Sequence, residues 1–152
     1  MENKPKRRII VIDDEPLIST LMKEVIEEDQ ELEISDIVTK KEEFLRLAQQ
    51  KRFDLALIDI SVGGREAGMD LIKTLQEKGI KIPAIMLSAH DEIDYALKCL
   101  LIGARGYVNK NYICSDLIKG LKTVLGGDLF VSGDRGSYIL NEFSRLKGAS
   151  KP

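Results

Sequence analysis

The chain has 152 residues, of which 43% are hydrophobic and 32% are charged, and it contains only 4 prolines. This composition is typical of one globular domain rather than of a disordered or fibrous protein. The formal net charge of −2 argues against a protein that binds nucleic acid mainly through a basic surface. No apolar run approaches the roughly 20 residues that a membrane span requires, and the two cysteines lie far apart in the sequence, which suits a reducing compartment. We therefore expect a cytoplasmic protein with no membrane association.

Strand-like and helix-like segments alternate along the first 127 residues. Continuous apolar runs predict strands at 8–12, 55–60, 83–87 and 106–109, with a weaker candidate at 32–38. Apolar residues at helical spacing predict helices at 15–28, 39–50, 68–78, 91–102 and 114–125. Such alternation implies right-handed crossovers and a parallel sheet with helices on both faces. The expected fold class is therefore α/β, a doubly wound five-stranded parallel sheet.

Residues 128–152 fall outside this alternation and are richer in Gly, Ser and Lys than the preceding chain. A short helix is possible over 137–146, whereas 147–152 is typical of a linker or a frayed tail. We expect one domain over 7–127 and a linker or tail over 128–152.

Polar residues follow the carboxyl ends of four predicted strands. Asp13 and Asp14 follow the first strand, and Asp59 lies near the end of the third. Ser88 follows the fourth strand and Lys110 the fifth. In a doubly wound sheet, ligands bind at this edge. Carboxylates gathered in one cleft repel each other and attract a hard divalent cation, and a cluster without His or Cys favours Mg²⁺.

Asp59 is the candidate nucleophile, because it stands alone on a central strand opposite the Asp13–Asp14 pair. A metal ion, the charge of Lys110 and the Ser88 hydroxyl would together stabilise a phosphoryl group bound to one carboxylate. The simpler alternative is that acidic residues favour helix N-termini, where the helix dipole stabilises them. That alternative explains one such residue alone, but not polar residues at four strand ends.

Four motifs occur in order along the chain: I-I-V-I-D-D-E-P, L-A-L-I-D-I, I-M-L-S-A and G-A-R-G-Y-V-N-K. Together they resemble the receiver domain of two-component response regulators. The segment 103–127 is similar to receivers of LuxR-type transcriptional regulators. The resemblance implies a flavodoxin-like, receiver-type fold and a phosphorylation-controlled signalling switch. Residues 128–152 are too few for a helix-turn-helix domain, so we expect DNA contact only through an output domain that this chain does not contain.

By this resemblance, Asp59 accepts a phosphoryl group from a sensor histidine kinase. Asp14 and Asp59 would bind Mg²⁺ directly, and Asp13 would bind it through water. The backbone carbonyl of Ser61 would complete the protein ligands of the metal ion.

The same resemblance assigns the residues that sense the phosphoryl group. Ser88 and Lys110 would hold its oxygens, and Tyr107 would be the switch aromatic, rotating inward when Ser88 moves. His90, two residues beyond Ser88, is a possible modulator of phosphate lifetime, although a surface histidine is the simpler interpretation.

The region 91–125 is expected to carry the signal outward. We expect a phosphorylation-favoured homodimer through this face, which carries more apolar residues than the exterior of a monomer explains if several of them are exposed. The apolar residues concerned are Leu100, Leu101, Ile113, Ile118 and Leu121.

Two positions depart from the family pattern. The loop from Ser61 to Gly68 lacks the usual proline and is one residue longer. Lys110 is followed by Asn111 rather than by proline, and because non-proline cis bonds are costly, no cis bond is expected there.

Two alternative functions are weighed against the switch. A stand-alone receiver or a pseudo-receiver could act as a protein-binding scaffold, but a pseudo-receiver is expected to lack Asp14, Asp59 or Lys110, and all three are present. A phosphatase of the haloacid dehalogenase type needs an Asp two residues after its nucleophile, where this chain has Ser61. We expect no enzyme, but at most self-catalysed phosphoryl transfer and autodephosphorylation.

Overall fold

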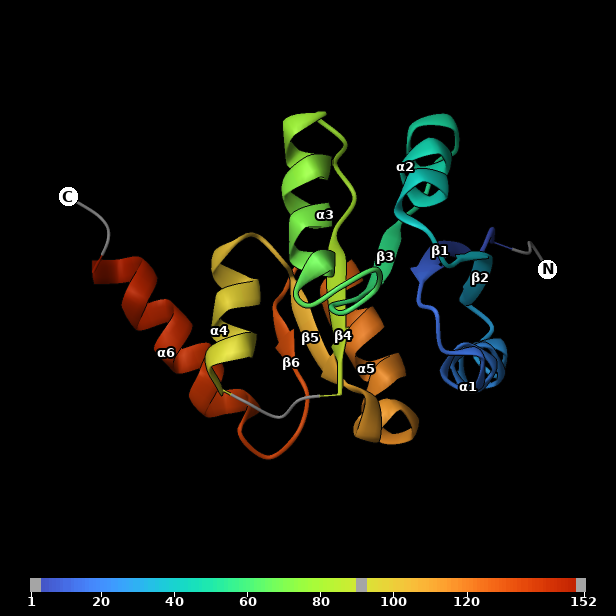
Figure 1. The fold of residues 1–152 in the computed structure, drawn as a ribbon. Helices are drawn as coiled ribbons and strands as arrows, with labels where there is room; N and C mark the ends of the chain where they lie inside the picture. Colours follow the sequence, from blue (N-terminus) through green and yellow to red (C-terminus); the bar gives the residue numbers. More distant parts are fainter. Residues whose placement is uncertain (1–3, 90–92, 150–152) are drawn as a thin grey trace.

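The computed structural model describes residues 4–89 and 93–149. These residues form one parallel sheet in the order β2-β1-β3-β4-β5-β6 (Figure 1). The strands are β1 (Arg7–Ile12), β2 (Leu32–Val38), β3 (Leu55–Asp59), β4 (Ala84–Ser88), β5 (Gly106–Asn109) and β6 (Phe130–Val131). The helices are α1 (Pro16–Glu27), α2 (Lys41–Gln50), α3 (Ala67–Glu77), α4 (Ile93–Leu101), α5 (Ile113–Leu125) and α6 (Gly136–Ala149), with a 3₁₀ turn at Lys110–Tyr112.

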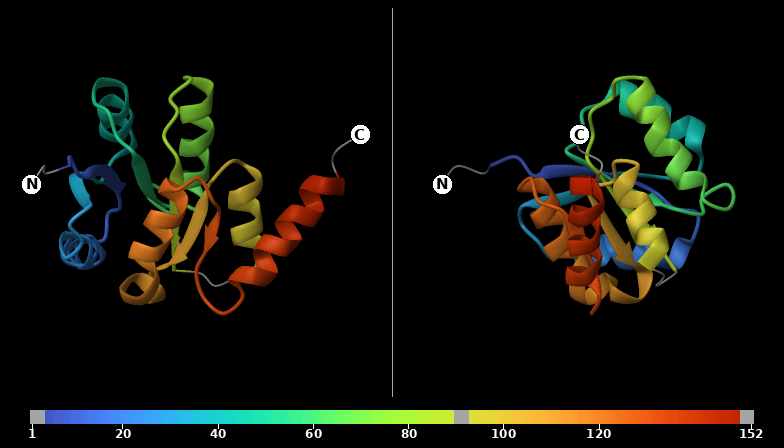
Figure 2. Two further views of the ribbon diagram at one scale, coloured as in Figure 1. Left: turned by 180° about the vertical axis from the view of Figure 1, so that it is seen from behind. Right: turned by 90° about the vertical axis from the view of Figure 1, so that its left-hand side faces the viewer.

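Helices cover both faces of the sheet, as the continuous apolar strands predict (Figure 2). Alternate strand residues belong to two separate core clusters: Ile9 and Val11 pack with α1 and α5, whereas Ile10 and Ile12 pack with α2, α3 and α4. All four isoleucine and valine side chains are fully buried. Burial of each stabilises the fold by about 1.5–3 kcal/mol relative to exposure. The predicted doubly wound α/β class is therefore confirmed.

The predicted number of strands is wrong, because β6 adds a sixth. It pairs with β5 in parallel, with Gly106 opposite Phe130 and Tyr107 opposite Val131. The ring of Phe130 lies over Gly120 of α5, where an added Cβ would come within 2.8 Å of it. The missing side chain at Gly120 thus makes room for β6. A strand of two residues is too short to show a periodic pattern in the sequence.

Helix α6 follows β6 and packs beside α4, leaning away from the body of the domain toward its far end (Figures 1 and 2). Ile139 is buried, and Leu140 and Phe143 pack against the same core cluster as Tyr107 of β5. The short helix that the sequence allowed at 137–146 therefore exists and extends further in both directions. The apolar side chains of α6 therefore form part of the domain core.

The apolar side chains expected on the outer face of 91–125 are mostly buried. Leu100, Ile113 and Leu121 are 2%, 1% and 0% exposed, because they face the two core clusters. Ile118 is half-buried, and Leu101 is 49% exposed. The three buried residues therefore give no support to a dimer contact on this face, and the homodimer through 91–125 stays a prediction.

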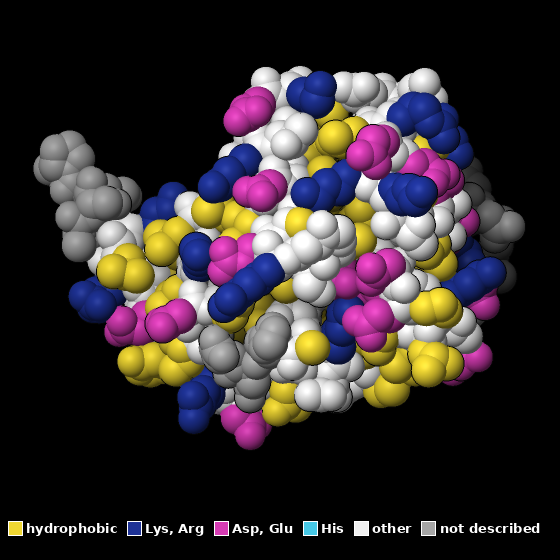
Figure 3. Space-filling view, viewed as in Figure 1, with side chains coloured by type: hydrophobic (Ala, Val, Ile, Leu, Met, Phe, Trp, Pro, Cys, Tyr) yellow, Lys and Arg dark blue, Asp and Glu magenta, His cyan; other side chains and the backbone are white. Residues whose placement is uncertain are grey.

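The surface shown in Figure 3 carries interspersed charges. Lys and Arg side chains alternate with Asp and Glu side chains across this face, with no extended field of one sign, in keeping with a net charge of −2. Within the described part of the chain, no helix has the length and apolar character needed to cross a membrane.

Candidate functional site

The residues predicted from the strand ends meet at the carboxyl edge of the sheet. Asp13 follows β1, and Asp59 is the last residue of β3. Ser88 ends β4, and Lys110 directly follows β5. Neighbouring strands end level with each other, since Ser88 is paired with Asn109 in the sheet register. The parallel arrangement thus brings residues that are up to a hundred positions apart in the sequence to one rim.

Three carboxylates form the centre of this rim. Asp13, Asp14 and Asp59 each place an oxygen within 4.8 Å of the others. Asp13 and Asp59 are 1% exposed, whereas Asp14 is exposed. Burial raises the pKa of Asp13 above its usual value, although the backbone N–H of Glu15 and the charge of Lys110 oppose that change.

Each buried carboxylate uses one oxygen and leaves the other without a hydrogen bond. Asp13 Oδ1 accepts a hydrogen bond of 2.7 Å from the N–H of Glu15. Asp59 Oδ1 accepts from both the N–H and the hydroxyl of Ser61, each at 3.1 Å. The Oδ2 atoms of Asp13 and Asp59 have no hydrogen-bond partner among the described residues. Both second oxygens are therefore available to a ligand.

Lys110 supplies the positive charge of the rim. Its ammonium nitrogen lies 3.2 Å from Asp13 Oδ2 and 3.3 Å from Asp59 Oδ2, in ion contacts that lack hydrogen-bond geometry. It donates a direct hydrogen bond to the carboxylate of Glu15. Burial lowers the pKa of Lys110, but the Glu15 hydrogen bond and the charges of Asp13 and Asp59 outweigh burial and raise it overall. Lys110 is thus held as a cation inside the site.

The donor set fits a hard cation. Three carboxylates converge, and the unpaired Oδ2 atoms of Asp13 and Asp59 are the kind of oxygen that Mg²⁺ binds. The Ser61 carbonyl, predicted as a further ligand, accepts a hydrogen bond of 3.1 Å from the N–H of Gly64. A carbonyl oxygen has a second lone pair, so this bond leaves it able to coordinate.

The lengthened loop between β3 and α3 is accommodated by unusual backbone angles. Gly63 and Gly64 have φ values of +81° and +144°, and Glu66 has +58°. The loop leads into α3, where the N–H of Gly68, the second residue of the helix, donates to the carbonyl of Ile60 at 2.8 Å. A Cβ at Gly68 would lie 2.4 Å from the Asp59 carbonyl oxygen. The positive φ angles at residues 63, 64 and 66 therefore accommodate the extra residue, and Gly68 lies in close contact with the end of β3.

The residues expected to respond to phosphorylation are buried. Ser88 is 0% exposed and Tyr107 is 3% exposed. Tyr107 belongs to the core cluster that includes Val131 and Ile139, so β6 and α6 cover it. Tyr107 is thus already buried in this conformation, and its rotation on phosphorylation stays a prediction. His90 lies outside the described residues.

One feature of the site was missed by the sequence reasoning. Glu15 follows Asp13 and Asp14 at the end of the first strand, but no role was predicted for it, and its side chain accepts a hydrogen bond from Lys110. The peptide between Lys110 and Asn111 is trans, since the described residues contain no cis bond. The sequence signal for the role of Glu15 was its position as a third acidic residue directly after Asp13 and Asp14.

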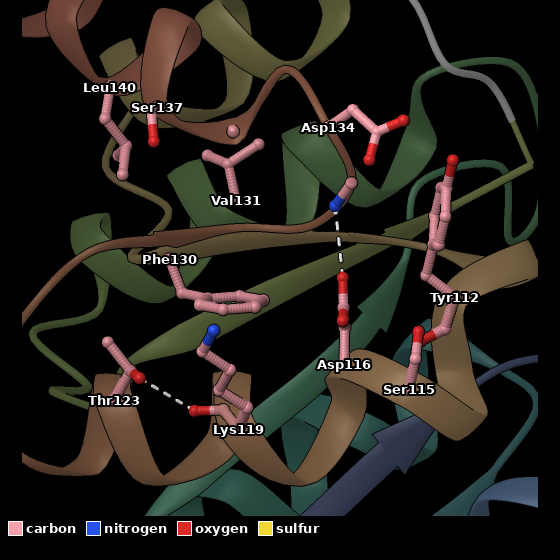
Figure 4. A pocket seen from close by; sticks show the side chains of 12 residues that line it. Tyr112, Ser115, Asp116, Lys119, Thr123, Phe130, Val131, Asp134, Ser137 and Leu140 are labelled. Carbon is pink, nitrogen blue, oxygen red and sulfur yellow. Dashed lines mark hydrogen bonds between the residues drawn. The ribbon is translucent and has the colours of Figure 1, made fainter.

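A groove of about 520 Å³ lies apart from the acidic rim, between α5 and the β6–α6 segment (Figure 4). Asp116 of α5 accepts a hydrogen bond of 3.1 Å from the N–H of Gly133, which ties the turn before α6 to α5. Thr123, Lys119 and Phe130 line the opposite end. The groove results from the docking of the last two elements and holds none of the three clustered carboxylates.

A doubly wound sheet with this carboxylate and lysine rim defines a receiver domain, the class of protein that the motifs resembled. The chain belongs to the response regulator receiver domain family, whose model matches residues 9–122.

Several relatives are transcriptional regulators. The transcriptional regulatory protein MctR of Rhizobium johnstonii is 26% identical over 152 residues, which cover 100% of this chain and 70% of MctR. DegU of Brevibacillus brevis is 29% identical over 147 residues, 95% of this chain and 61% of DegU. The nitrate/nitrite response regulator NarL of Escherichia coli is 26% identical over 132 residues, 87% of this chain and 61% of NarL. This chain thus spans 61–70% of the length of these relatives.

Solved structures share the fold. A LuxR-family two-component response regulator from Aurantimonas sp. SI85-9A1 superposes with a TM-score of 0.79 at 20% identity, covering 95% of this chain and 99% of that one. The non-phosphorylated receiver domain of RcsB from Escherichia coli gives 0.75 at 19% identity, covering 85% and 100%. These structures have the same fold as this chain.

Proposed function

We propose that the chain is a phosphorylation-controlled switch in which Asp59 accepts a phosphoryl group from a sensor histidine kinase. The observation that supports this proposal most directly is Asp59 itself. Its carboxylate is buried at a strand end, and its Oδ2 atom has no hydrogen bond. Lys110 stands 3.3 Å from that atom. A buried carboxylate oxygen left free beside a fixed cation is suited to attack an electrophilic phosphorus.

The transfer forms one bond and breaks one. Asp59 Oδ2 attacks the phosphorus of the phosphohistidine, the new O–P bond forms, and the P–N bond breaks with its electron pair returning to the imidazole. Ser61 orients the nucleophile, because its N–H and hydroxyl fix Asp59 Oδ1. Ser88 and Lys110 then hold the phosphoryl oxygens, the lysine as a charge-assisted donor.

We assign the Mg²⁺ ligands to Asp13, Asp14 and Asp59, with the Ser61 carbonyl completing the set. Bound Mg²⁺ neutralises the negative charge that accumulates on the transferred phosphoryl group. The exposed position of Asp14 leaves room for the water molecules that Mg²⁺ retains. The buried carboxylate of Asp13 has one oxygen engaged by the chain and one available, which suits ligation through water.

We further propose that this receiver belongs to a transcription regulator and acts on DNA only through an output domain, with homodimerisation favoured by phosphorylation. Relatives are transcriptional regulators, and a structure similar in fold is described as RcsB dimers bound to DNA. The face over 91–125 remains our candidate for the dimer contact. Since α6 packs beside α4, that contact would include α6 or require it to move.

Phosphate uptake on Asp59 tests the proposal. Incubation of the chain with acetyl phosphate and Mg²⁺ should add one base-labile phosphate, measured by intact mass. Asp59→Asn should add none, whereas Asp70→Asn, which changes an exposed carboxylate of α3, should behave as the wild type. Stoichiometric uptake by Asp59→Asn would refute the assignment.

Metal binding is tested separately by thermal unfolding. Mg²⁺ should raise the melting temperature by mass action, and Asp14→Ala should abolish that increase. An undiminished increase in Asp14→Ala would place the metal ion elsewhere.

A further inference from the structure

Three carboxylates surround the ammonium group of Lys110 before any phosphoryl group arrives. A lysine has three N–H donors and no acceptor. Lys110 Nζ faces three carboxylates: it is hydrogen-bonded to Glu15 and lies 3.2 Å and 3.3 Å from Asp13 and Asp59. Its one direct hydrogen bond goes to Glu15, so a phosphoryl oxygen that approaches Lys110 competes with these carboxylates, and with Glu15 for a donor already in use.

Glu15 is the carboxylate that can be released at the lowest cost. The side chains of Asp13 and Asp59 are 0% and 1% exposed, whereas that of Glu15 is 54% exposed. A released Glu15 carboxylate regains its hydration, whereas a buried aspartate that loses its cation becomes an uncompensated charge.

We propose that Glu15 is a latch that holds Lys110 in the unphosphorylated protein and competes with the phosphoryl group for it. This inference rests on the proposed phosphorylation of Asp59. Glu15 touches neither the attacking oxygen nor the phosphorus, so it is a positioning residue that acts through Lys110.

The backbone of Glu15 is fixed, so the latch can open by side-chain rotation alone. Its N–H donates to Asp13 Oδ1 at 2.7 Å, and its carbonyl accepts from the N–H of Ser19 at 3.1 Å in the first turn of α1. Pro16 follows it directly. The Glu15 side chain makes no capping hydrogen bond to α1. Its release therefore disturbs neither the start of the helix nor the position of Asp13.

The latch predicts tighter binding of a phosphoryl mimic when Glu15 loses its charge. With Mg²⁺ present, Glu15→Gln should lower the dissociation constant for beryllofluoride about threefold to tenfold, the range for a partly exposed charged hydrogen bond. The matched control is Glu66→Gln, which removes one negative charge from the loop after Asp59 and should change affinity less than twofold. Titrations of the full chain followed by ¹⁹F NMR give these constants.

A double-mutant cycle separates the latch from a general charge effect. In a Lys110→Met background, Glu15→Gln should no longer tighten binding, because no lysine remains to be released. The side-chain ¹⁵N resonance of Lys110 gives a second measurement. It should shift when beryllofluoride is added to the wild type, and in Glu15→Gln it should already have moved before addition.

Three results would overturn the latch. The wild type and Glu15→Gln could bind beryllofluoride with equal affinity, or Glu15→Gln could tighten binding equally in the Lys110→Met background. The third is a Lys110 side-chain ¹⁵N resonance at the same position in the wild type and in Glu15→Gln. Each of these leaves the proposed function intact as long as the wild type binds beryllofluoride and Asp59→Asn does not. Failure of the wild type to bind it would instead refute the proposed function.

Discussion

The close approach of Gly68 to the end of β3 gives a quantitative test of how the site is supported. A Cβ at this position would lie 2.4 Å from the Asp59 carbonyl oxygen and 2.8 Å from the Ile60 Cα. Both atoms belong to the backbone and cannot rotate away, so β3 or α3 must shift. Such overpacking costs about 1–3 kcal/mol, and the better helix propensity of alanine offsets at most about 1 kcal/mol. Gly68→Ala should therefore destabilise the chain by about 2 kcal/mol.

Thermal unfolding measures this loss, which corresponds to a decrease in melting temperature of about 4–8 °C for a chain of this size. Gly148→Ala is the matched control, because its added Cβ would meet nothing within 4 Å; it should leave the melting temperature unchanged or raise it by up to about 4 °C through helix propensity. Phosphate uptake by Gly68→Ala should also slow, since the shift moves the backbone of Asp59. A melting temperature equal to that of the wild type would refute the steric argument.

Three further predictions concern other parts of the chain. Asp29 lies 2.9 Å from Lys122, and the hydrogen bond from Lys122 lowers the pKa of Asp29 below 3.8. The ionised Asp29 carboxylate therefore stabilises the fold above pH 3.8. The decrease in melting temperature caused by Asp29→Asn should become smaller as the pH falls below 3.8. A deficit independent of pH would contradict this. Phe130→Ala should cost about 3 kcal/mol in urea unfolding, because the ring packs over Gly120, and a loss below about 1 kcal/mol would mean that β6 is not part of the cooperative unit. Proposed as a modulator, His90 should on substitution by alanine change the dephosphorylation rate several-fold, and identical decay curves would make it an ordinary surface residue.

The sequence predicted those parts of the fold that depend on local pattern. Strands buried on both faces have continuous apolar runs, so β1 and β3 could be placed within one residue of their observed bounds. The rim followed from topology alone, because parallel strands deliver their last residues to one edge. For this reason the sequence alone predicts that Asp59 and Lys110 lie at the same edge.

Features that depend on tertiary contacts could not be predicted in this way. Strand β6 has only two residues, and its position is set by the space above Gly120. Tyr107 pairs with Val131 of β6 and shares a core cluster with Ile139 of α6, and both elements lie outside the strand–helix alternation. The hydrogen bond from Lys110 to Glu15 joins residues 95 positions apart, and side-chain reach across a rim leaves no periodic signal.

The segment that leads from β6 into α6 is hydrogen-bonded to the end of β5. The hydroxyl of Ser132 accepts a hydrogen bond of 2.8 Å from the N–H of Asn109, the residue immediately before Lys110, and the N–H of Ser132 donates to the carbonyl of Tyr107 at 2.9 Å. The 14 residues of α6 form an arm about 20 Å long. A rotation of roughly 10° at its base would displace its far end by about 3–4 Å. A small rotation transmitted from β5 through these hydrogen bonds would therefore be largest at the outer end of α6.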